Sequence, residues 1–125
     1  ENMRSIRSKD TSPERTVRSM VHRLGFRFRL HRKDLPGKPD LAFPSRKKVI
    51  FVNGCFWHGH GCRSVARKPK TNTEYWVEKI RENKKRDARN RRKLRTMGWE
   101  TLVIWECETE KDPERLRDRL VSFLR

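Results

Sequence analysis

The spacing of apolar residues along the chain predicts three helices. Residues 11–24 form the first, because apolar side chains recur every three or four positions after a Thr-Ser-Pro-Glu start in which Glu14 can close a capping box. Residues 71–97 form a long second helix that begins with a similar capping pattern and ends before Gly98. An Asp-Pro pair opens the last helix, over residues 112–124, whose apolar side chains fall on one side.

Four shorter segments have the pattern of strands. Residues 26–30 alternate apolar and polar side chains, as expected for a strand with one buried face, and residues 40–43 form a short strand after a Pro-Gly turn. Residues 48–52 and 102–105 are continuous apolar runs, which are typical of buried strands. The order α-β-β-β-α-β-α predicts a single α/β domain over residues 1–125, with a mixed central sheet flanked by helices.

Composition narrows the function. The 33 Lys and Arg residues outnumber 16 Asp and Glu, so the net charge is +17 and the isoelectric point about 10.9. This imbalance predicts a polyanionic partner, with nucleic acid the leading candidate. A membrane surface is a weaker alternative, because no apolar run approaches the roughly 20 residues of a spanning helix, and we expect no signal peptide. The chain starts at Glu1 rather than Met, from which we expect a longer natural sequence.

The segment Cys-Phe-Trp-His-Gly-His-Gly-Cys, over residues 55–62, indicates a metal site. Cys55, Cys62 and Cys107 supply three thiolates, and one of His58 and His60 would complete the four ligands of structural zinc. This requires the strands before Cys55 and Cys107 to be neighbours. The alternatives are small buried cysteines with ordinary loop histidines, or a cysteine nucleophile, which lacks an acid to orient a histidine base. An odd number of cysteines at metal-like spacing also fits a reducing cytoplasm.

A second cluster of candidate residues suits hydrolysis. Asp40 follows a turn at the start of a strand, where its carboxylate and the backbone carbonyl of Val52 could bind Mg²⁺. His58, if it is not a zinc ligand, is a candidate general base beside them, and Glu14 is a third candidate. The alternative for Asp40 is a turn residue that bonds its own backbone, and for Glu14 the capping box.

Basic and aromatic residues surround these clusters. Residues 79–95 contain ten Lys or Arg and two acids, which indicates phosphate contact rather than a merely solvated helix. Phe56, Trp57 and Trp76 border the metal loop and the start of this helix, where aromatic side chains can stack on bases or wedge between base pairs. For Tyr75 alone, core packing is the better interpretation.

With these residues in view, the chain resembles the very short patch repair (Vsr) endonucleases, a bacterial family of DNA mismatch nickases. The matching segments follow the family order and span most of the chain: residues 2–6 (NMRSI), 35–40 (LPGKPD), 50–58 (IFVNGCFWH), 73–80 (TEYWVEKI) and 98–107 (GWETLVIWEC).

The resemblance implies a restriction-endonuclease-like fold, structural zinc and Mg²⁺-dependent cleavage of double-stranded DNA. The family nicks the phosphodiester 5′ of the thymine in a T:G mismatch, a product of 5-methylcytosine deamination, and leaves a 5′-phosphate. It also implies a monomer in the bacterial cytoplasm, associated with the nucleoid, with mismatch-repair proteins as candidate partners. Residues 1–11 are expected to form an extended arm that contacts DNA.

The resemblance also assigns roles to individual residues. It implies that zinc is bound by Cys55, His60, Cys62 and Cys107. It implies that the catalytic residues are Asp40, His58 and Glu14, with the Val52 carbonyl as a ligand of Mg²⁺. The side chains that it implies to intercalate into DNA are those of Phe56, Trp57 and Trp76.

This chain departs from a known family pattern in having Val52 and Asn53 where that pattern has Thr and His. A backbone carbonyl survives the change at position 52. Two other functions remain alternatives. A zinc-stabilised DNA-bending protein would explain the charge, zinc and aromatics but not the grouping of Asp40 with His58. A restriction-type nuclease that cuts both strands would favour a symmetric dimer.

Overall fold

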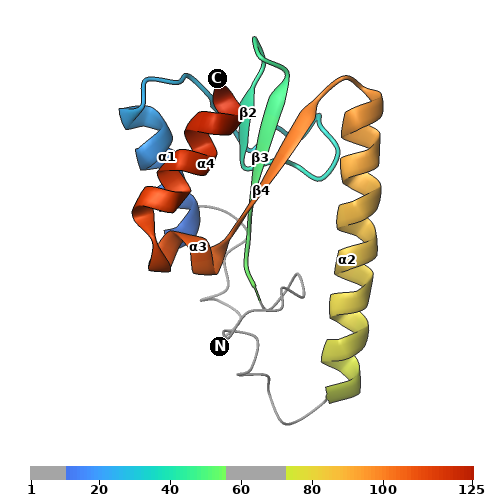
Figure 1. The fold of residues 1–125 in the computed structure, drawn as a ribbon. Coiled ribbons are helices and arrows are strands. Elements are labelled where there is room, and N and C mark those ends of the chain that lie inside the picture. The colour runs from blue at the N-terminus through green and yellow to red at the C-terminus, as the bar shows by residue number, and fades with distance from the viewer. Residues whose placement is uncertain (1–10, 56–72) are drawn as a thin grey trace.

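The computed structural model describes residues 11–55 and 73–125, which form a four-stranded sheet with helices on both faces (Figure 1). The elements follow one another in this order: α1 (Ser12–Arg23), β1 (Arg29–Leu30), β2 (Leu41–Phe43), β3 (Lys48–Asn53), α2 (Thr73–Thr96), β4 (Glu100–Trp105), α3 (Glu106–Lys111) and α4 (Pro113–Leu124). The predicted mixed α/β class is therefore confirmed.

The sheet has the order β1-β2-β3-β4. The first three strands form an antiparallel meander, and β4 pairs with β3 in parallel after the crossover through α2. This is the topology expected from three short strands, a long helix and a final strand. The carboxyl ends of β3 and β4 therefore lie side by side, with Asn53 opposite Trp105. The neighbouring strand ends that the zinc prediction required are present.

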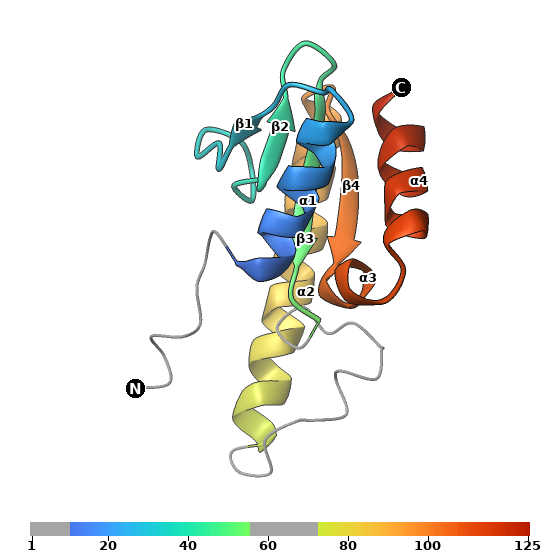
Figure 2. The same ribbon diagram turned by 90° about the vertical axis from the view of Figure 1, so that its left-hand side faces the viewer.

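Alternate residues of β3 supply two separate cores. Ile50 packs into one core, with α1 and α4 on that face of the sheet, and these two helices contribute Val17 and Leu120 to it. Val49 packs into the other core with Leu94 of α2. Figure 2 shows α1 in front of the sheet and α2 behind it, and Figure 1 shows α4 on the same side as α1. The apolar run at residues 48–52 is thus covered on both faces, as predicted.

The predicted ends of the helices are confirmed where the structure describes them. Thr11 caps α1, because its hydroxyl oxygen accepts a 3.3 Å hydrogen bond from the Glu14 backbone N–H. Gly98 ends the turn after α2 with φ of +91°, a conformation that glycine adopts without penalty. Asp112 caps α4 by accepting a bond from the Arg115 N–H. The predicted cap at Thr71 lies outside the described residues.

Three local predictions need correction. The strand expected over residues 26–30 is reduced to Arg29–Leu30, because Phe26 and Phe28 pack against the core from an unpaired segment. The short helix α3 was not predicted, since its six residues are too few for a periodic pattern. The final strand β4 lies at the edge of the described sheet rather than within it, and most of its residues are only half-buried.

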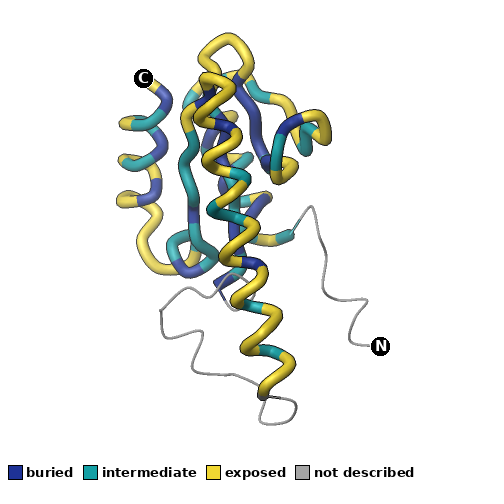
Figure 3. Tube along the Cα trace, turned by 90° about the vertical axis from the view of Figure 1, so that its right-hand side faces the viewer, coloured by how far each residue is buried: buried dark blue, intermediate teal, exposed yellow. Residues whose placement is uncertain are grey.

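Helix α2 extends beyond the carboxyl ends of β3 and β4, and most of the half that projects there is exposed (Figure 3). All ten Lys and Arg residues between positions 79 and 95 are exposed. No helix in residues 11–55 or 73–125 combines the length and apolar character needed to cross a membrane.

Candidate active site

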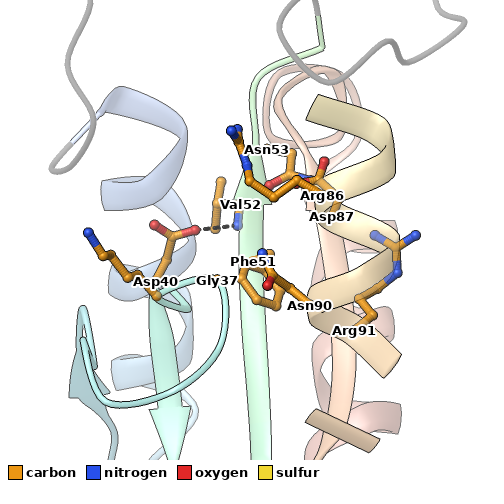
Figure 4. A pocket seen from close by; sticks show the side chains of 10 residues that line it. Gly37, Asp40, Phe51, Val52, Asn53, Arg86, Asp87, Asn90 and Arg91 are labelled. Carbon is orange, nitrogen blue, oxygen red and sulfur yellow. Dashed lines mark hydrogen bonds between the residues drawn. The ribbon is translucent and has the colours of Figure 1, made fainter. Parts of the chain in front are cut away.

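Asp40 and Val52 meet where β2 begins and β3 approaches its end. The Val52 backbone N–H donates a 2.6 Å hydrogen bond to Oδ2 of Asp40 (Figure 4). The N–H and C=O groups of one strand residue point to the same edge of the strand, so the Val52 carbonyl also lies on the Asp40 side of β3. A carboxylate oxygen and a backbone carbonyl oxygen, the kinds of ligand that Mg²⁺ prefers, therefore lie at the same place.

Glu14 brings a second carboxylate to this place from the first turn of α1. Its side chain is only 2% exposed, and it contacts the His31 imidazole and, at 3.8 Å, the Arg18 guanidinium. Ligand atoms of Glu14, His31 and Asp40 all lie within 4.8 Å of one another. From the sequence, the Glu14 side chain could serve either in a capping box or in catalysis. In the structure its carboxylate lies beside Asp40.

His31 is a site residue that the sequence analysis missed. Its backbone N–H donates a 3.2 Å bond to the Asp40 carbonyl, which extends the antiparallel pairing of β1 with β2 by one residue. Its φ of +48° turns the chain immediately after β1, and its ring contacts Glu14. The sequence signal was weak, because His31 directly follows the alternating segment at residues 26–30 and simply continues its pattern of polar positions.

A pocket of about 530 Å³ opens between the Asp40 end of the sheet and α2 (Figure 4). From the sheet side it is lined by Asp40, Val52 and Asn53, and α2 contributes four polar side chains to the opposite wall: Arg86, Asp87, Asn90 and Arg91. The pocket combines a carboxylate with guanidinium groups. It can therefore accommodate a phosphate and a cation together.

The loop before Asp40 is fitted closely against α2. Gly37 has φ of +80°, and a Cβ at this position would lie 3.1 Å from the Phe51 ring and 3.2 Å from Cβ of Asn90. At the start of the same loop, Arg32 donates two bonds to Asp34, and this hydrogen bonding lowers the pKa of the exposed Asp34 carboxyl. The close contact at Gly37 fixes one wall of the pocket.

The comparisons with known proteins agree with one another. The profile of the family "DNA mismatch endonuclease Vsr" matches residues 1–64. The chain is 56% identical over 122 residues to the Type II nicking enzyme V.XorIIP of Xanthomonas oryzae pv. oryzae, covering 98% of this chain and 88% of that protein. It is 40% identical over 121 residues to the DNA mismatch endonuclease Vsr of Escherichia coli, covering 97% and 76%. The chain belongs to the Vsr family. It is thus a DNA endonuclease of the mismatch and nicking type, and its substrate is DNA.

A further Vsr relative extends the agreement to a different genus. The Type II nicking enzyme V.NmeAIP of Neisseria meningitidis is 42% identical over 123 residues, which cover 98% of this chain and 86% of that protein. The binding-only alternative, a DNA-bending protein without catalysis, is therefore wrong, since the family consists of endonucleases.

Two of the four zinc ligands expected in this Vsr endonuclease lie within the described residues. Cys55 follows β3 and Cys107 lies in the first turn of α3, each two positions beyond the Asn53–Trp105 pair. Both thiols are buried. The Cys55 backbone N–H donates a 3.3 Å bond to the Glu106 carboxylate, which ties the two segments together. The placement fits zinc, and the remaining expected ligands, His60 and Cys62, lie outside the described residues.

The predicted wedge is only partly described. Trp76 is half-buried in α2 and contacts Tyr75 edge to face, with ring centroids 5.0 Å apart. Tyr75 itself is 57% exposed, so the expectation that it packs in the core is wrong, because the first turns of α2 project past the sheet. Phe56 and Trp57 lie outside the described residues, as does His58, the predicted general base.

The face that α2 turns toward the site carries residues that the sequence analysis did not single out. Among its more buried positions are Asn83, Asp87 and Asn90, which recur every three or four residues. The side chain of Asn83 is 6% exposed and accepts a 2.7 Å bond from Arg86. These three residues recur at helical spacing in the sequence. They were overlooked because the Lys and Arg residues around them suggested a helix that is exposed on all sides.

Proposed function

We propose that the protein nicks duplex DNA at T:G mismatches in a reaction that requires Mg²⁺, cutting 5′ of the mismatched thymine and leaving a 5′-phosphate. The observation that carries the proposal is the hydrogen bond between Asp40 and Val52, which holds a carboxylate beside a strand-end carbonyl at the mouth of a polar pocket. The Vsr and nicking-enzyme names of the relatives support the reaction class and the mismatch substrate.

The donor set fits magnesium. Mg²⁺ takes oxygen ligands, usually one or two carboxylates, and keeps several waters. Asp40 and the Val52 carbonyl would hold it, with Glu14 close by. When bound, the ion would neutralise charge on the phosphate and on the leaving oxygen.

The remaining steps belong to side chains. We assign His58 as the general base that takes a proton from the attacking water, and Glu14 as the carboxylate that orients this water. Arg86 and Arg91 line the pocket and would contact phosphate oxygens of the cut strand. Trp76, which is half-buried in the first turn of α2, would open the base stack at the mismatch together with Phe56 and Trp57.

Structural zinc would brace the loop between β3 and α2. Cys55 and Cys107, together with His60 and Cys62, form a complete tetrahedral donor set. The segment between Cys55 and Cys62 carries Phe56, Trp57 and His58, so zinc would set the position of these residues relative to Asp40. The ion would have no part in bond cleavage.

The direct test uses duplexes labelled on each strand, either fully paired or carrying one T:G mismatch. We expect a single nick in the thymine strand of the mismatched duplex with Mg²⁺, and none with EDTA. Cleavage of the paired duplex at an equal rate would reject mismatch recognition. Cleavage of both strands would instead favour the restriction-type alternative, and cleavage in EDTA would reject the magnesium assignment.

A further inference from the structure

One edge of the sheet is open in the part of the chain that the structure describes. β4 pairs with β3 on one side and with no described strand on the other (Figure 1). We propose that the first half of this edge is a docking site for an acidic, extended segment of a partner protein, which would add a strand to the sheet. The inference goes beyond the proposed DNA cleavage, because β4 lies two strands away from β2, where Asp40 is found.

The backbone of β4 determines which groups face outward. The Glu100 N–H donates a 2.9 Å bond to the Lys47 carbonyl, on the side of β3. Because successive strand residues direct their N–H and C=O groups to opposite edges, Thr101 and Val103 direct theirs away from β3. Among the described residues, neither backbone group of Thr101 has a hydrogen-bond partner, and nor does the Val103 N–H. A row of unpaired groups of this kind is a template for a further strand.

Side chains close the second half of the same edge. The Val103 carbonyl accepts a 3.4 Å bond from the Arg119 guanidinium. The Trp105 N–H donates a 2.8 Å bond to the Glu108 carboxylate, and Glu108 forms an ion pair with Arg119. Charged side chains protect exposed strand edges in this way in many proteins. The protection ends before Thr101, so the first half of the edge stays available for pairing.

A groove of about 970 Å³ lies along the open half of the edge. Helix α2 supplies Arg91 and Arg95 to its lining, and α4 supplies Arg115. None of these three guanidinium groups has a carboxylate partner among the described residues. The two helices cover opposite faces of the sheet, so the arginines flank the edge from both faces. An anionic ligand on the edge would therefore be attracted from both sides.

Backbone chemistry and charge decide between the possible occupants. The open edge offers two donors and one acceptor. DNA phosphates only accept hydrogen bonds, whereas a peptide backbone supplies both kinds of group. A second copy of this chain is a poor match, since its net charge is +17. The segments outside the described residues match poorly for the same reason: residues 1–10 contain three Lys or Arg and two acids, and residues 56–72 contain four Lys or Arg and no acid.

The geometry of a strand indicates where the acids of the ligand should stand. Successive side chains of an added strand point to opposite faces of the sheet. One acidic side chain would therefore reach Arg91 and Arg95 on α2, and the next would reach Arg115 on α4. The ligand is thus a short extended segment with consecutive Asp or Glu residues.

The test uses a fluorescently labelled peptide, Thr-Val-Glu-Glu-Glu-Glu-Val-Thr, whose β-branched residues favour an extended chain. Fluorescence anisotropy at fixed salt measures its binding to the protein. A second peptide carries N-methyl groups on all four glutamate amides, so it keeps every charge but cannot donate to the edge of β4. We expect the unmethylated peptide to bind at least about 10-fold more tightly. Equal binding of the two peptides, or no binding of either, would overturn the proposal.

Variants of the edge separate strand addition from simple charge attraction. Thr101→Pro removes the outward N–H and leaves the bonds between β3 and β4 in place, whereas Thr101→Ala, the matched control, keeps this N–H. We expect Thr101→Pro to weaken peptide binding at least about 10-fold, with Thr101→Ala unchanged. Equal binding by these two variants would overturn the proposal.

A pair of double variants tests the arginines and does not depend on how Thr101→Pro folds. Arg95→Gln with Arg115→Gln should weaken peptide binding about 3- to 30-fold, the range for loss of two exposed ion pairs. Arg92→Gln with Arg117→Gln removes the same charge from exposed positions of α2 and α4 outside the groove, and it should have no such effect. An equal loss in both double variants would reduce the attraction to net charge and overturn the proposal.

Two further outcomes would assign the edge to another occupant and also overturn the proposal. One is tighter binding of paired DNA than of the peptide, lost in Arg95→Gln with Arg115→Gln but not in the control pair. The other is a dimer in sedimentation of the unaltered protein that Thr101→Pro abolishes. Thr101→Pro should nick the T:G duplex at the rate of the unaltered protein. If the peptide binds as expected but no mismatched duplex is nicked by the unaltered protein, only the proposed function fails.

Discussion

The Asp40 carboxylate accepts a 2.6 Å hydrogen bond from the backbone N–H of Val52. This bond joins the first residue after the loop to the end of β3, and it uses one oxygen of the carboxylate. A side-chain amide could accept the same bond without the negative charge. An asparagine at position 40 would therefore remove the negative charge and keep the hydrogen bond to the Val52 backbone N–H.

We expect Asp40→Asn to lower the nicking rate by at least about 100-fold, because the loss of a carboxylate ligand removes several kcal/mol of charge stabilisation. Binding to the mismatched duplex should persist. Single-turnover nicking and a binding titration at fixed salt measure the two effects. Asp34→Asn is the matched control, since this carboxylate lies in the same loop and is 62% exposed. Full activity in Asp40→Asn would exclude Asp40 as a metal ligand.

Gly37 offers a test of how the loop before Asp40 supports the site. Gly37→Ala places a methyl group against Phe51 and Asn90 at a positive φ, so we expect both lower stability and slower nicking. Gly25→Ala has a similar φ of +90° but nothing within 4 Å. It should lose only the roughly 1–2 kcal/mol of backbone strain and keep its activity. Urea unfolding and single-turnover rates compare the two variants. Equal activity in both would show that the close contact at Gly37 does not position Asp40.

The sequence was sufficient for the features that depend on local chemistry and on strand order. The zinc hypothesis required the strands before Cys55 and Cys107 to be neighbours, which a helical crossover permits, and β3 and β4 do pair in parallel at that end of the sheet. The Pro-Gly turn likewise placed Asp40 near the end of β3. These inferences succeeded because buried strands and right-handed crossovers allow few arrangements.

The sequence was insufficient where a contact depends on the exact length of a connection. His31 lies opposite Asp40 only because the loop between them closes after β1, and no periodic pattern reveals that pairing. Tyr75 was assigned to the core because aromatic residues are usually buried, whereas the sheet ends before it reaches the first turns of α2. The extent to which one element projects past another is a property of the assembled fold.

The two buried cysteines predict the effect of losing a zinc ligand. Cys107→Ser should abolish stoichiometric zinc and lower the melting temperature, because metal binding contributes directly to folding free energy. Cys107→His should restore part of both, since imidazole is also a zinc ligand. Elemental analysis and thermal unfolding measure the two properties. Zinc-free unaltered protein with the same melting temperature as zinc-loaded protein would contradict a structural zinc site.

The aromatic start of α2 allows the wedge to be tested at a residue that the structure describes. Trp76 is half-buried and lies between two exposed side chains, Tyr75 and Val77. Trp76→Ala should weaken binding to the T:G duplex by about 1–3 kcal/mol, the range for loss of one base–aromatic stack. It should also reduce the fluorescence rise of 2-aminopurine placed beside the mismatch, because the bases would stay stacked. Val77→Ala changes a more exposed apolar residue on the same turn and should leave both signals unchanged. If Trp76→Ala binds and unstacks the duplex as the unaltered protein does, Trp76 packs against the protein in the complex and the wedge must be formed elsewhere.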